Sequence, residues 1–226
     1  MFRVKICGVT TAEDALLVAE AGADAIGFNF YPRSPRFISP AAARRIAESL
    51  PGGLLRVGVL VNPSEQDAID LVASAALDAL QLHGDEPPEL AARISRNVPV
   101  IKVFRVASEG ILPVVAYLEQ FRRSGGVLGA VLFDAYHPSQ FGGIGKTADW
   151  AAIQRYPTEP WHPPFILAGG LTAENVAAAI QAVSPAGVDV ASGVEQSPGR
   201  KDPKRVIEFV RAAKLALRSS ASRDSS

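Results

Sequence analysis

The stretch 165-FILAGGLTAENV-176 contains the unit from which the rest of the chain is built. Its three apolar residues, 165–167, are typical of a buried strand, and a helix is predicted from residue 173. Gly169 and Gly170 join the two with nothing bulky between them, so the backbone can approach a ligand closely. Free N–H groups near a helix start attract anions, most often phosphate. The stretch therefore predicts a strand-to-helix unit with an anion-binding turn.

The same unit recurs along the 226 residues. Strands are predicted at 3–6, 25–30, 56–61, 78–82, 99–103, 129–133, 165–168 and 187–191, and helices at 12–21, 40–49, 65–75, 87–95, 111–122, 148–154, 173–182 and 203–217. Strict alternation indicates a parallel sheet. The length is close to the ~250 residues typical of (β/α)8 barrels. It favours a single α/β domain over residues 1–217, folded as a (β/α)8 TIM barrel. In this fold the active site lies at the C-terminal ends of the strands. A doubly wound open sheet stays the alternative. The polar tail 218–226 is expected to be disordered.

Four helix starts carry recognisable caps. Thr11 and Ser64 are each followed by an aspartate three residues later, in the pattern of a capping box. Ser39 and Asp202 each precede a proline, which suits the first helical position.

Composition limits the classes of partner. The chain has 23 basic and 23 acidic residues, and we expect no nucleic-acid partner because no basic stripe is visible. No apolar run approaches the ~20 residues of a membrane span, and no signal peptide is evident. The single cysteine excludes an internal disulfide and a thiolate metal cluster. We therefore expect a cytoplasmic protein without a metal site, either a monomer or a homodimer.

Two loops suit a phosphate. Gly169 and Gly170 follow the seventh predicted strand, and Ser192 and Gly193 follow the eighth, which is the usual phosphate pair of this barrel. Each loop alone is more often a simple tight turn, but the two together favour a phosphorylated small-molecule ligand. The segment 142-GGIGKT-147 is not a nucleotide phosphate loop, because that pattern needs glycine where the chain has Gln140.

Cys7 and Asp134 are the candidate catalytic pair, because each ends a predicted strand. A lone cysteine is most often a small buried hydrophobe. Lys5, two residues earlier, points the same way and would favour the thiolate, which can act as general base or nucleophile. Asp134 could instead form a turn, although no helix is predicted before residue 148. An apolar barrel mouth favours a protonated carboxyl, which makes Asp134 a candidate general acid.

Two further residues are candidates for binding substrate. Arg36 lies in a loop stiffened by Pro32 and Pro35, and a guanidinium suits a planar carboxylate. A solvated surface arginine is the alternative, and it fits Arg33 equally well. His83 follows the fourth predicted strand and either lines the mouth or caps the next turn.

Seven motifs together resemble phosphoribosylanthranilate isomerase. They are VKICG at 4–8, GADAIGFNFYPRSPRFISP at 22–40, VGVLVN at 57–62, LQLHGDE at 80–86, FDAYHPSQFGGIGKTADW at 133–150, PFILAGGLTAENV at 164–176, and GVDVASGVE with PGRKDP at 187–203. They occur in order and cover nearly every loop that follows a strand, from residue 3 to about 215.

The resemblance implies an enzyme of tryptophan biosynthesis. It would convert N-(5-phosphoribosyl)anthranilate into 1-(2-carboxyphenylamino)-1-deoxyribulose 5-phosphate by an Amadori rearrangement. By this resemblance Cys7 is the general base, Asp134 the general acid and Arg36 the partner of the anthranilate carboxylate. The two glycine loops hold the phosphate, and no cofactor or metal is required.

Other functions were weighed against this one. A metal-dependent sugar-phosphate epimerase would need histidines and acids at several strand ends, where only His83 qualifies. Indole-glycerol-phosphate synthase would need catalytic lysines and glutamates. Lys5 and Lys102 are available, but they suit ion pairing inside the barrel equally well. A non-catalytic phosphometabolite-binding protein would need the glycine loops but neither Cys7 nor Asp134.

Overall fold

The computed structural model describes residues 2–106, 110–135, 150–157 and 159–221. Its strands are β1 Val4–Cys7, β2 Ala25–Asn29, β3 Leu55–Leu60, β4 Ala79–Leu82, β5 Val100–Val106, β6 Ala130–Ala135, β7 Phe165–Leu167, β8 Gly187–Val190, β9 Glu195–Ser197 and β10 Arg200–Lys201. Its helices are α1 Ala12–Glu20, α2 Pro40–Ser49, α3 Glu65–Ser74, α4 Pro88–Ser95, α5 Leu112–Arg123, α6 Trp150–Ile153, α7 Val176–Val183 and α8 Pro203–Ala221, with a 3-10 turn η1 at Ser192–Val194. The segment 142–147 and the first two residues of the predicted helix 148–154 lie outside these ranges.

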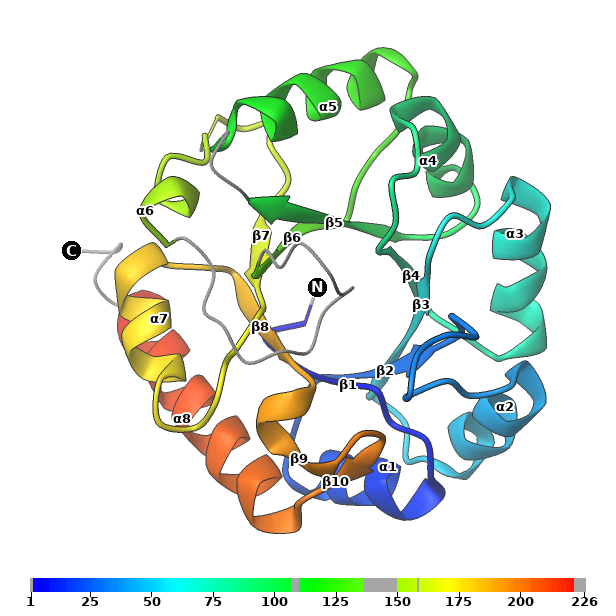
Figure 1. Cartoon of the computed structure of the whole chain (residues 1–226), viewed down its shortest axis with the longest axis vertical. Helices are drawn as coiled ribbons and strands as arrows, with labels where there is room; N and C mark the ends of the chain where they lie inside the picture. The colour runs from blue at the N-terminus through cyan, green and yellow to red at the C-terminus, as the bar shows by residue number, and fades with distance from the viewer. Residues whose placement is uncertain (1, 107–109, 136–149, 158, 222–226) are drawn as a thin grey trace.

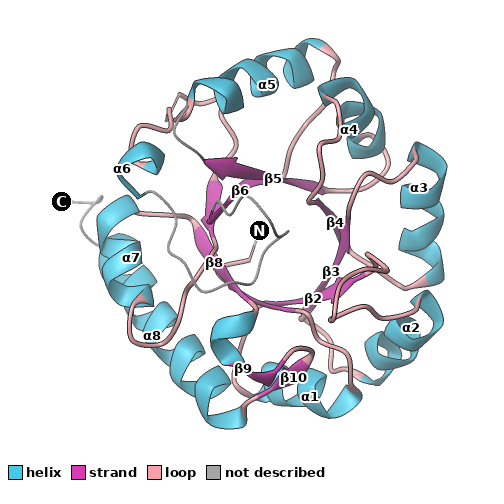
Figure 2. Cartoon of the chain, viewed as in Figure 1, coloured by secondary structure: helices cyan, strands magenta, loops and turns pink. Residues whose placement is uncertain are grey.

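Strands β1 to β8 form a closed parallel barrel in chain order, and the helices form a ring around it (Figure 1). The ring is closed because β1 pairs with both neighbours: Lys5 lies opposite Ala25 of β2 and opposite Asp189 of β8. An open sheet would leave two unpaired edges, so the TIM-barrel prediction is confirmed and the doubly wound alternative is wrong. Figure 2 shows the helices as the outer layer and strands β1 to β8 as the inner one.

The predicted caps start their helices as expected. Thr11 Oγ1 accepts a hydrogen bond from the Asp14 amide at the start of α1, and Ser64 does the same for α3. Ser39 caps α2 with proline at the next position, and the Asp202 carboxylate accepts from the Arg205 amide at the start of α8. Each bond satisfies an amide that the helix itself leaves free.

Two separate apolar cores hold the barrel. The larger lies between the strands and the helices and includes Ile6, Phe28 and Phe209. The smaller fills the lower interior of the barrel, where its members include Phe2, Ile101, Leu132 and Ile166. The upper interior, at the C-terminal ends of the strands, contains polar side chains instead. This division leaves the upper end open for a ligand, as barrels of this type require.

Strand β5 continues to Val106, three residues beyond its predicted end. The structure differs from the sequence prediction in four other places. Strand β6 contains Asp134 and extends to residue 135, two residues beyond its predicted end at 133. Helix α7 starts at Val176 with Asn175 as its N-cap, three residues later than predicted, because the Asn175 side chain closes a turn to Gly170 and Thr172. Helix α8 continues to Ala221, through the first part of the tail that was expected to be disordered.

The fourth difference is the hairpin of β9 and β10, which sequence patterns did not predict. Its strands have three and two residues, too short to show the alternation that marks a strand.

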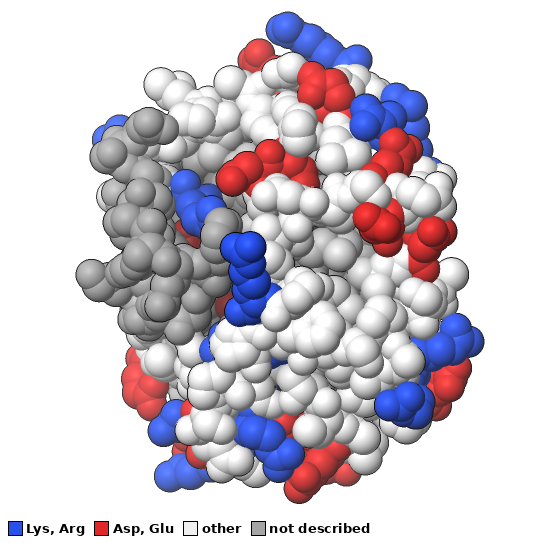
Figure 3. Space-filling model, turned by 45° about the vertical axis from the view of Figure 1, so that its right-hand side comes forward, with Lys and Arg blue, Asp and Glu red and all other residues white. Residues whose placement is uncertain are grey.

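On the face shown in Figure 3, lysine and arginine side chains are interspersed with aspartate and glutamate. Within the described part of the chain, no helix combines the length and the apolar character needed to cross a membrane.

Candidate active site

A pocket of about 580 Å³ opens at the C-terminal ends of the barrel strands. This volume lies within the range of small-molecule sites, about 300–1,000 Å³. All eight residues selected from the sequence line it: Cys7, Arg36, His83, Asp134, Gly169, Gly170, Ser192 and Gly193. Residues far apart in sequence meet there because every strand points its C-terminal end toward the same face.

Cys7 ends β1 with its sulfur packed against the backbone of Gly27 on β2. A Cβ at Gly27 would lie 2.7 Å from Sγ of Cys7 and 3.0 Å from Cε of Lys5, so no larger residue fits between them. Burial raises the pKa of the Cys7 thiol above its ordinary value, although the ammonium groups of Lys5 and Lys201 act in the opposite direction. Lys5 thus favours the thiolate, as expected, but desolvation is the larger effect and the pKa of the Cys7 thiol is raised.

Lys5 is fully buried inside the barrel below Cys7. Its Nζ donates to the Asp189 carboxylate at 2.8 Å and to the Gln81 side-chain oxygen at 3.0 Å. Burial alone would lower the pKa of Lys5, but Asp189 and Cys7 raise it above its ordinary value. Lys5 therefore forms an ion pair with Asp189 inside the barrel, which was the alternative to a catalytic lysine in the sequence analysis. Lys102 does not, because it lies on the outer side of β5 and pairs with Glu86 at 2.8 Å.

Asp134 and His83 face each other in the pocket. Oδ2 of Asp134 lies 3.4 Å from Nε2 of His83, and Nδ1 of His83 lies 3.4 Å from Nε2 of Gln81. The turn after β4 is held by Glu86, whose Oε1 accepts from the amides of Asn62 and Gly84. His83 thus lines the mouth, and the alternative that it caps this turn is wrong.

Arg36 lies in the pocket wall with its guanidinium bound to Glu195. Its Nε is 2.9 Å from Oε1, and its Nη2 is 2.6 Å from Oε2, which is the two-bond geometry that arginine favours with a carboxylate. The Arg36 side chain is 13% exposed, so the surface-arginine alternative is wrong for Arg36, whereas Arg33 is exposed at the rim. Within the described ranges, Nη1 of Arg36 makes no hydrogen bond and remains able to donate.

The two glycine loops lie directly against each other. A Cβ at Gly193 would lie 1.9 Å from the carbonyl oxygen of Leu171, so only glycine allows this contact. Gly169 and Gly170 have φ angles of +87° and +63°, a backbone conformation that glycine adopts most readily. Among the described residues, the amides of Gly170 and Gly193 have no hydrogen-bond acceptor. Two such free N–H groups are suited to an anion.

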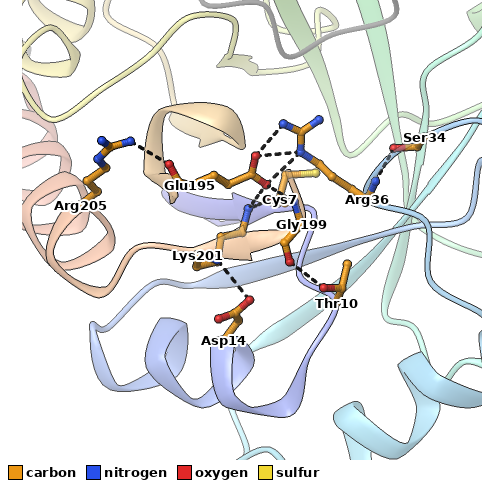
Figure 4. A network of polar contacts seen from close by, with 9 residues as sticks. All are labelled: Cys7, Thr10, Asp14, Ser34, Arg36, Glu195, Gly199, Lys201 and Arg205. Atoms are coloured by element: carbon orange, nitrogen blue, oxygen red, sulfur yellow. Dashed lines mark hydrogen bonds and ion pairs between the residues drawn. The ribbon is translucent and has the colours of Figure 1, made fainter. Parts of the chain in front are cut away.

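Several buried polar residues at or next to the pocket were missed by the sequence analysis. Asp189 and Gln81 are buried polar residues in otherwise apolar strands, a signal that could have identified them. Glu195 and Lys201 gave no such signal, because their contacts are distant in the sequence. Lys201, for example, binds the carbonyl oxygen of Cys7, which is 194 residues away (Figure 4). Within the described part of the chain, no three His, Cys, Asp or Glu side chains are grouped as metal ligands.

A family model described as N-(5'phosphoribosyl)anthranilate (PRA) isomerase matches residues 4–212. The chain belongs to this family. N-(5'-phosphoribosyl)anthranilate isomerases from Trichlorobacter lovleyi and Thermotoga maritima are 46% and 44% identical to it, over 96% and 95% of this chain and 100% and 99% of their own. The family resemblance seen in the sequence is thus confirmed, and with it an isomerase of tryptophan biosynthesis.

Solved structures agree with this family. Phosphoribosyl anthranilate isomerase from Thermotoga maritima has a TM-score of 0.83 and 44% identity, and covers 95% of this chain and 100% of that one. A second structure of the family is in complex with reduced 1-(o-carboxyphenylamino)-1-deoxyribulose 5-phosphate, with a TM-score of 0.80, 41% identity, and coverage of 95% and 100%. A third describes monomers generated from the dimeric Thermotoga maritima enzyme, with a TM-score of 0.78, 41% identity, and coverage of 95% and 100%.

Proposed function

We propose that this isomerase works by general acid–base catalysis, with Asp134 as the acid and Cys7 as the base. The observation that supports this is their position: Asp134 is the second-last residue of β6, Cys7 is the last of β1, and both line one pocket with Arg36 and the two glycine loops. The substrate, N-(5-phosphoribosyl)anthranilate, has a carboxylate at one end and a phosphate at the other. Binding both ends fixes the sugar carbons C1 and C2 between the two catalytic groups.

The reaction needs two proton transfers that these groups can supply. Asp134 donates a proton to the ring oxygen, which breaks the bond from C1 to that oxygen and forms an iminium at C1. The iminium makes the C2 proton acidic, and the Cys7 thiolate removes it to give an enolamine. Protonation at C1 and loss of the C2 hydroxyl proton then give the ketone, so that product and substrate are isomers. Each transfer by a placed group contributes about 10²–10⁴-fold.

The raised pKa of Cys7 has two opposite consequences for this step. It makes the thiolate a stronger base toward carbon, but it lowers the thiolate fraction at neutral pH. Lys5 and Lys201 limit the second effect, because their positive charges favour the thiolate.

The two ends of the substrate have separate binding groups. Nη1 of Arg36 is available to bind the anthranilate carboxylate, while Glu195 holds the other side of the guanidinium. The free amides of Gly170 and Gly193 are available to the phosphate. His83, next to Asp134, is placed to contact the ribose. No metal or cofactor takes part in these steps. We further infer that the protein is cytoplasmic. We also infer that it is either a monomer or a homodimer, and analytical sedimentation would distinguish these two oligomeric states.

The test is to measure turnover and product binding in Cys7→Ala and Asp134→Asn after metal chelation. Each variant should lose about 10²–10⁴-fold in kcat while the product Kd changes little, because neither side chain is assigned to the phosphate or the carboxylate. Expression in a tryptophan auxotroph that lacks this isomerase should restore growth with the unaltered chain but not with Asp134→Asn. Near-normal turnover in either variant would remove the role assigned to that residue.

Arg36→Ala tests the carboxylate contact separately. It should raise KM at least tenfold with a smaller change in kcat, since a charge-assisted pair contributes to ground-state and transition-state binding alike. An unchanged KM would contradict the assignment.

A further inference from the structure

We propose that Glu195 and Lys201 are positioning residues that hold Arg36 and the end of β1 in one fixed relation. Neither is assigned to contact substrate; they act through the groups that do. The inference rests on the roles proposed above for Cys7 and Arg36, and it adds a reason why those two residues stay aligned.

Glu195 restrains the arginine. Its carboxylate, 4% exposed, accepts from Nε and Nη2 of Arg36, from Nζ of Lys201 at 2.8 Å and from the Gly199 amide at 3.2 Å. These contacts involve both oxygens, so the carboxylate cannot rotate without breaking several of them. A guanidinium held by two parallel bonds keeps its plane, and the free Nη1 then points in one direction only. The stem of Arg36 is also confined, since a Cβ at Gly8 would lie 2.5 Å from its Cδ.

Lys201 joins this pair to the catalytic strand. Its Nζ has no exposed surface, and it donates both to Glu195 and to the backbone carbonyl oxygen of Cys7, at 2.8 and 2.5 Å (Figure 4). One ammonium group therefore connects the carboxylate that holds Arg36 to the peptide that bears the thiol. A shift of the Cys7 peptide would therefore also move the Glu195 carboxylate, and with it the guanidinium of Arg36.

The hairpin that bears Lys201 is itself fastened to the loop after β1. The Thr10 hydroxyl donates to the Gly199 carbonyl oxygen at 2.6 Å, and the Lys201 amide donates to the Asp14 carboxylate at 3.2 Å. Arg205 of α8 donates to the Glu195 carbonyl oxygen at 2.7 Å. Side chains from the loop after β1, from α1 and from α8 thus bind the main chain of the hairpin that bears Lys201.

Stability alone does not account for this ion pair. Burial lowers the pKa of Lys201, and Glu195 only partly offsets that effect. Removing two charges from water is costly, and apolar side chains of similar size often stabilise a fold as well or better. A positioning role explains why charged groups occupy these two positions.

The chain offers a matched control for the experiment. Lys102 and Glu86 form a second buried pair, also 2.8 Å apart and 3% and 0% exposed, but Lys102 donates to the carbonyl oxygen of Gly84 outside the barrel. Lys102→Met and Lys201→Met therefore each remove one buried ammonium group from a buried carboxylate. Glu195 keeps its ion pair with Arg36, and Glu86 keeps its bonds from the amides of Asn62 and Gly84.

The first measurement is kinetic. Lys201→Met should lower kcat about ten- to a hundredfold with less than about a threefold change in KM, because a small displacement of the catalytic group is enough for such a loss. Glu195→Gln should raise KM about tenfold, because the guanidinium is no longer held. If Glu195 merely neutralised the charge of Arg36, Glu195→Gln would strengthen binding of the substrate carboxylate and lower KM. An unchanged or lower KM would therefore overturn the positioning role of Glu195. An unchanged kcat in Lys201→Met would overturn the role of Lys201.

The second measurement is the pH dependence of iodoacetamide alkylation, which is specific because Cys7 is the only cysteine. The charged groups that act on its thiol are Lys5, Asp189, Lys201 and Arg36. Removing the charge of Lys201 should move the alkylation midpoint to higher pH. Simple loosening would hydrate the thiol and move the midpoint to lower pH, which would overturn the inference. Lys102→Met should lower the melting temperature to a similar degree and leave the midpoint unchanged.

The two proposals fail in different ways. If Cys7→Ala or Arg36→Ala retains normal kinetics, the proposed function is wrong. If those variants are impaired as expected while Lys201→Met and Glu195→Gln match the unaltered enzyme, only the positioning role is wrong.

Discussion

The lower and upper halves of the barrel interior are built from the same strands but differ in chemistry. Along β6 the inward-facing residues run from Ala130 through Leu132 to Asp134, apolar below and polar above. From Ala79 and Gln81 of β4 to His83, just after that strand, the same change occurs. The lower half is filled with apolar side chains, whereas the upper half contains ion pairs and a pocket. The comparison teaches that a strand can supply stability at one end and reactive groups at the other.

The largest expected effect is in the upper half, at Gly170. Its φ of +63° is one that Asp and Asn tolerate, so Gly170→Asp should fold while placing a carboxylate beside the bound phosphate. Like charges about 4 Å apart at an effective dielectric of about 20 repel by about 4 kcal/mol, close to a thousandfold in Kd. Isothermal titration with product measures this. Gly170→Asn is the neutral control and should weaken binding far less; equal losses in both variants would contradict a phosphate site.

The next effect is in the lower half, at Ile166, which is fully buried. Ile166→Ala should reduce the free energy of unfolding by about 2–5 kcal/mol through lost contacts and a cavity. Urea unfolding measures this loss, and kcat/KM per folded molecule should stay within about twofold. A catalytic loss above tenfold in fully folded protein would show that the two halves are not separable.

A smaller effect concerns the pH dependence at the boundary between the halves. Because burial raises the pKa of Cys7, the thiolate fraction should rise tenfold per pH unit through the ordinary thiol range of about 8.5. The iodoacetamide alkylation rate should therefore keep rising from pH 7 to 9 without levelling. A plateau below pH 8.5 would mean that Lys5 and Lys201 outweigh desolvation.

The smallest effect is expected at the rim, where Arg33 lines the pocket but is exposed. Arg33→Ala should change KM by less than about threefold, because solvent and salt screen an exposed charge. Steady-state kinetics beside Arg36→Ala would show the contrast between a rim arginine and a wall arginine. Equal rises in KM in both variants would mean that Arg33 shares the carboxylate.

Much of the site could be predicted because it depends on local patterns. Cys7 and Asp134 each close an apolar run, and in a parallel barrel every such end lies at one face. The glycine loops were visible for the same reason. The direction of the pKa shift of Cys7 was not predictable, since desolvation depends on how tightly Gly27 and its neighbours enclose the sulfur. Helix α7 began later than its composition suggested, because the Asn175 side chain competes for the first turn.

The amino-acid sequence by itself determined the alternation of strands and helices, the caps and the ends of strands where reactive groups belong. These features depend on neighbours within a few residues, whose spacing sets which side chains share a face. Only the tertiary structure decided that Lys201 binds the Cys7 carbonyl and that Glu195 holds Arg36, across 194 and 159 residues. Closing the barrel brings such groups together, and nothing in their immediate sequence encodes the distance between them.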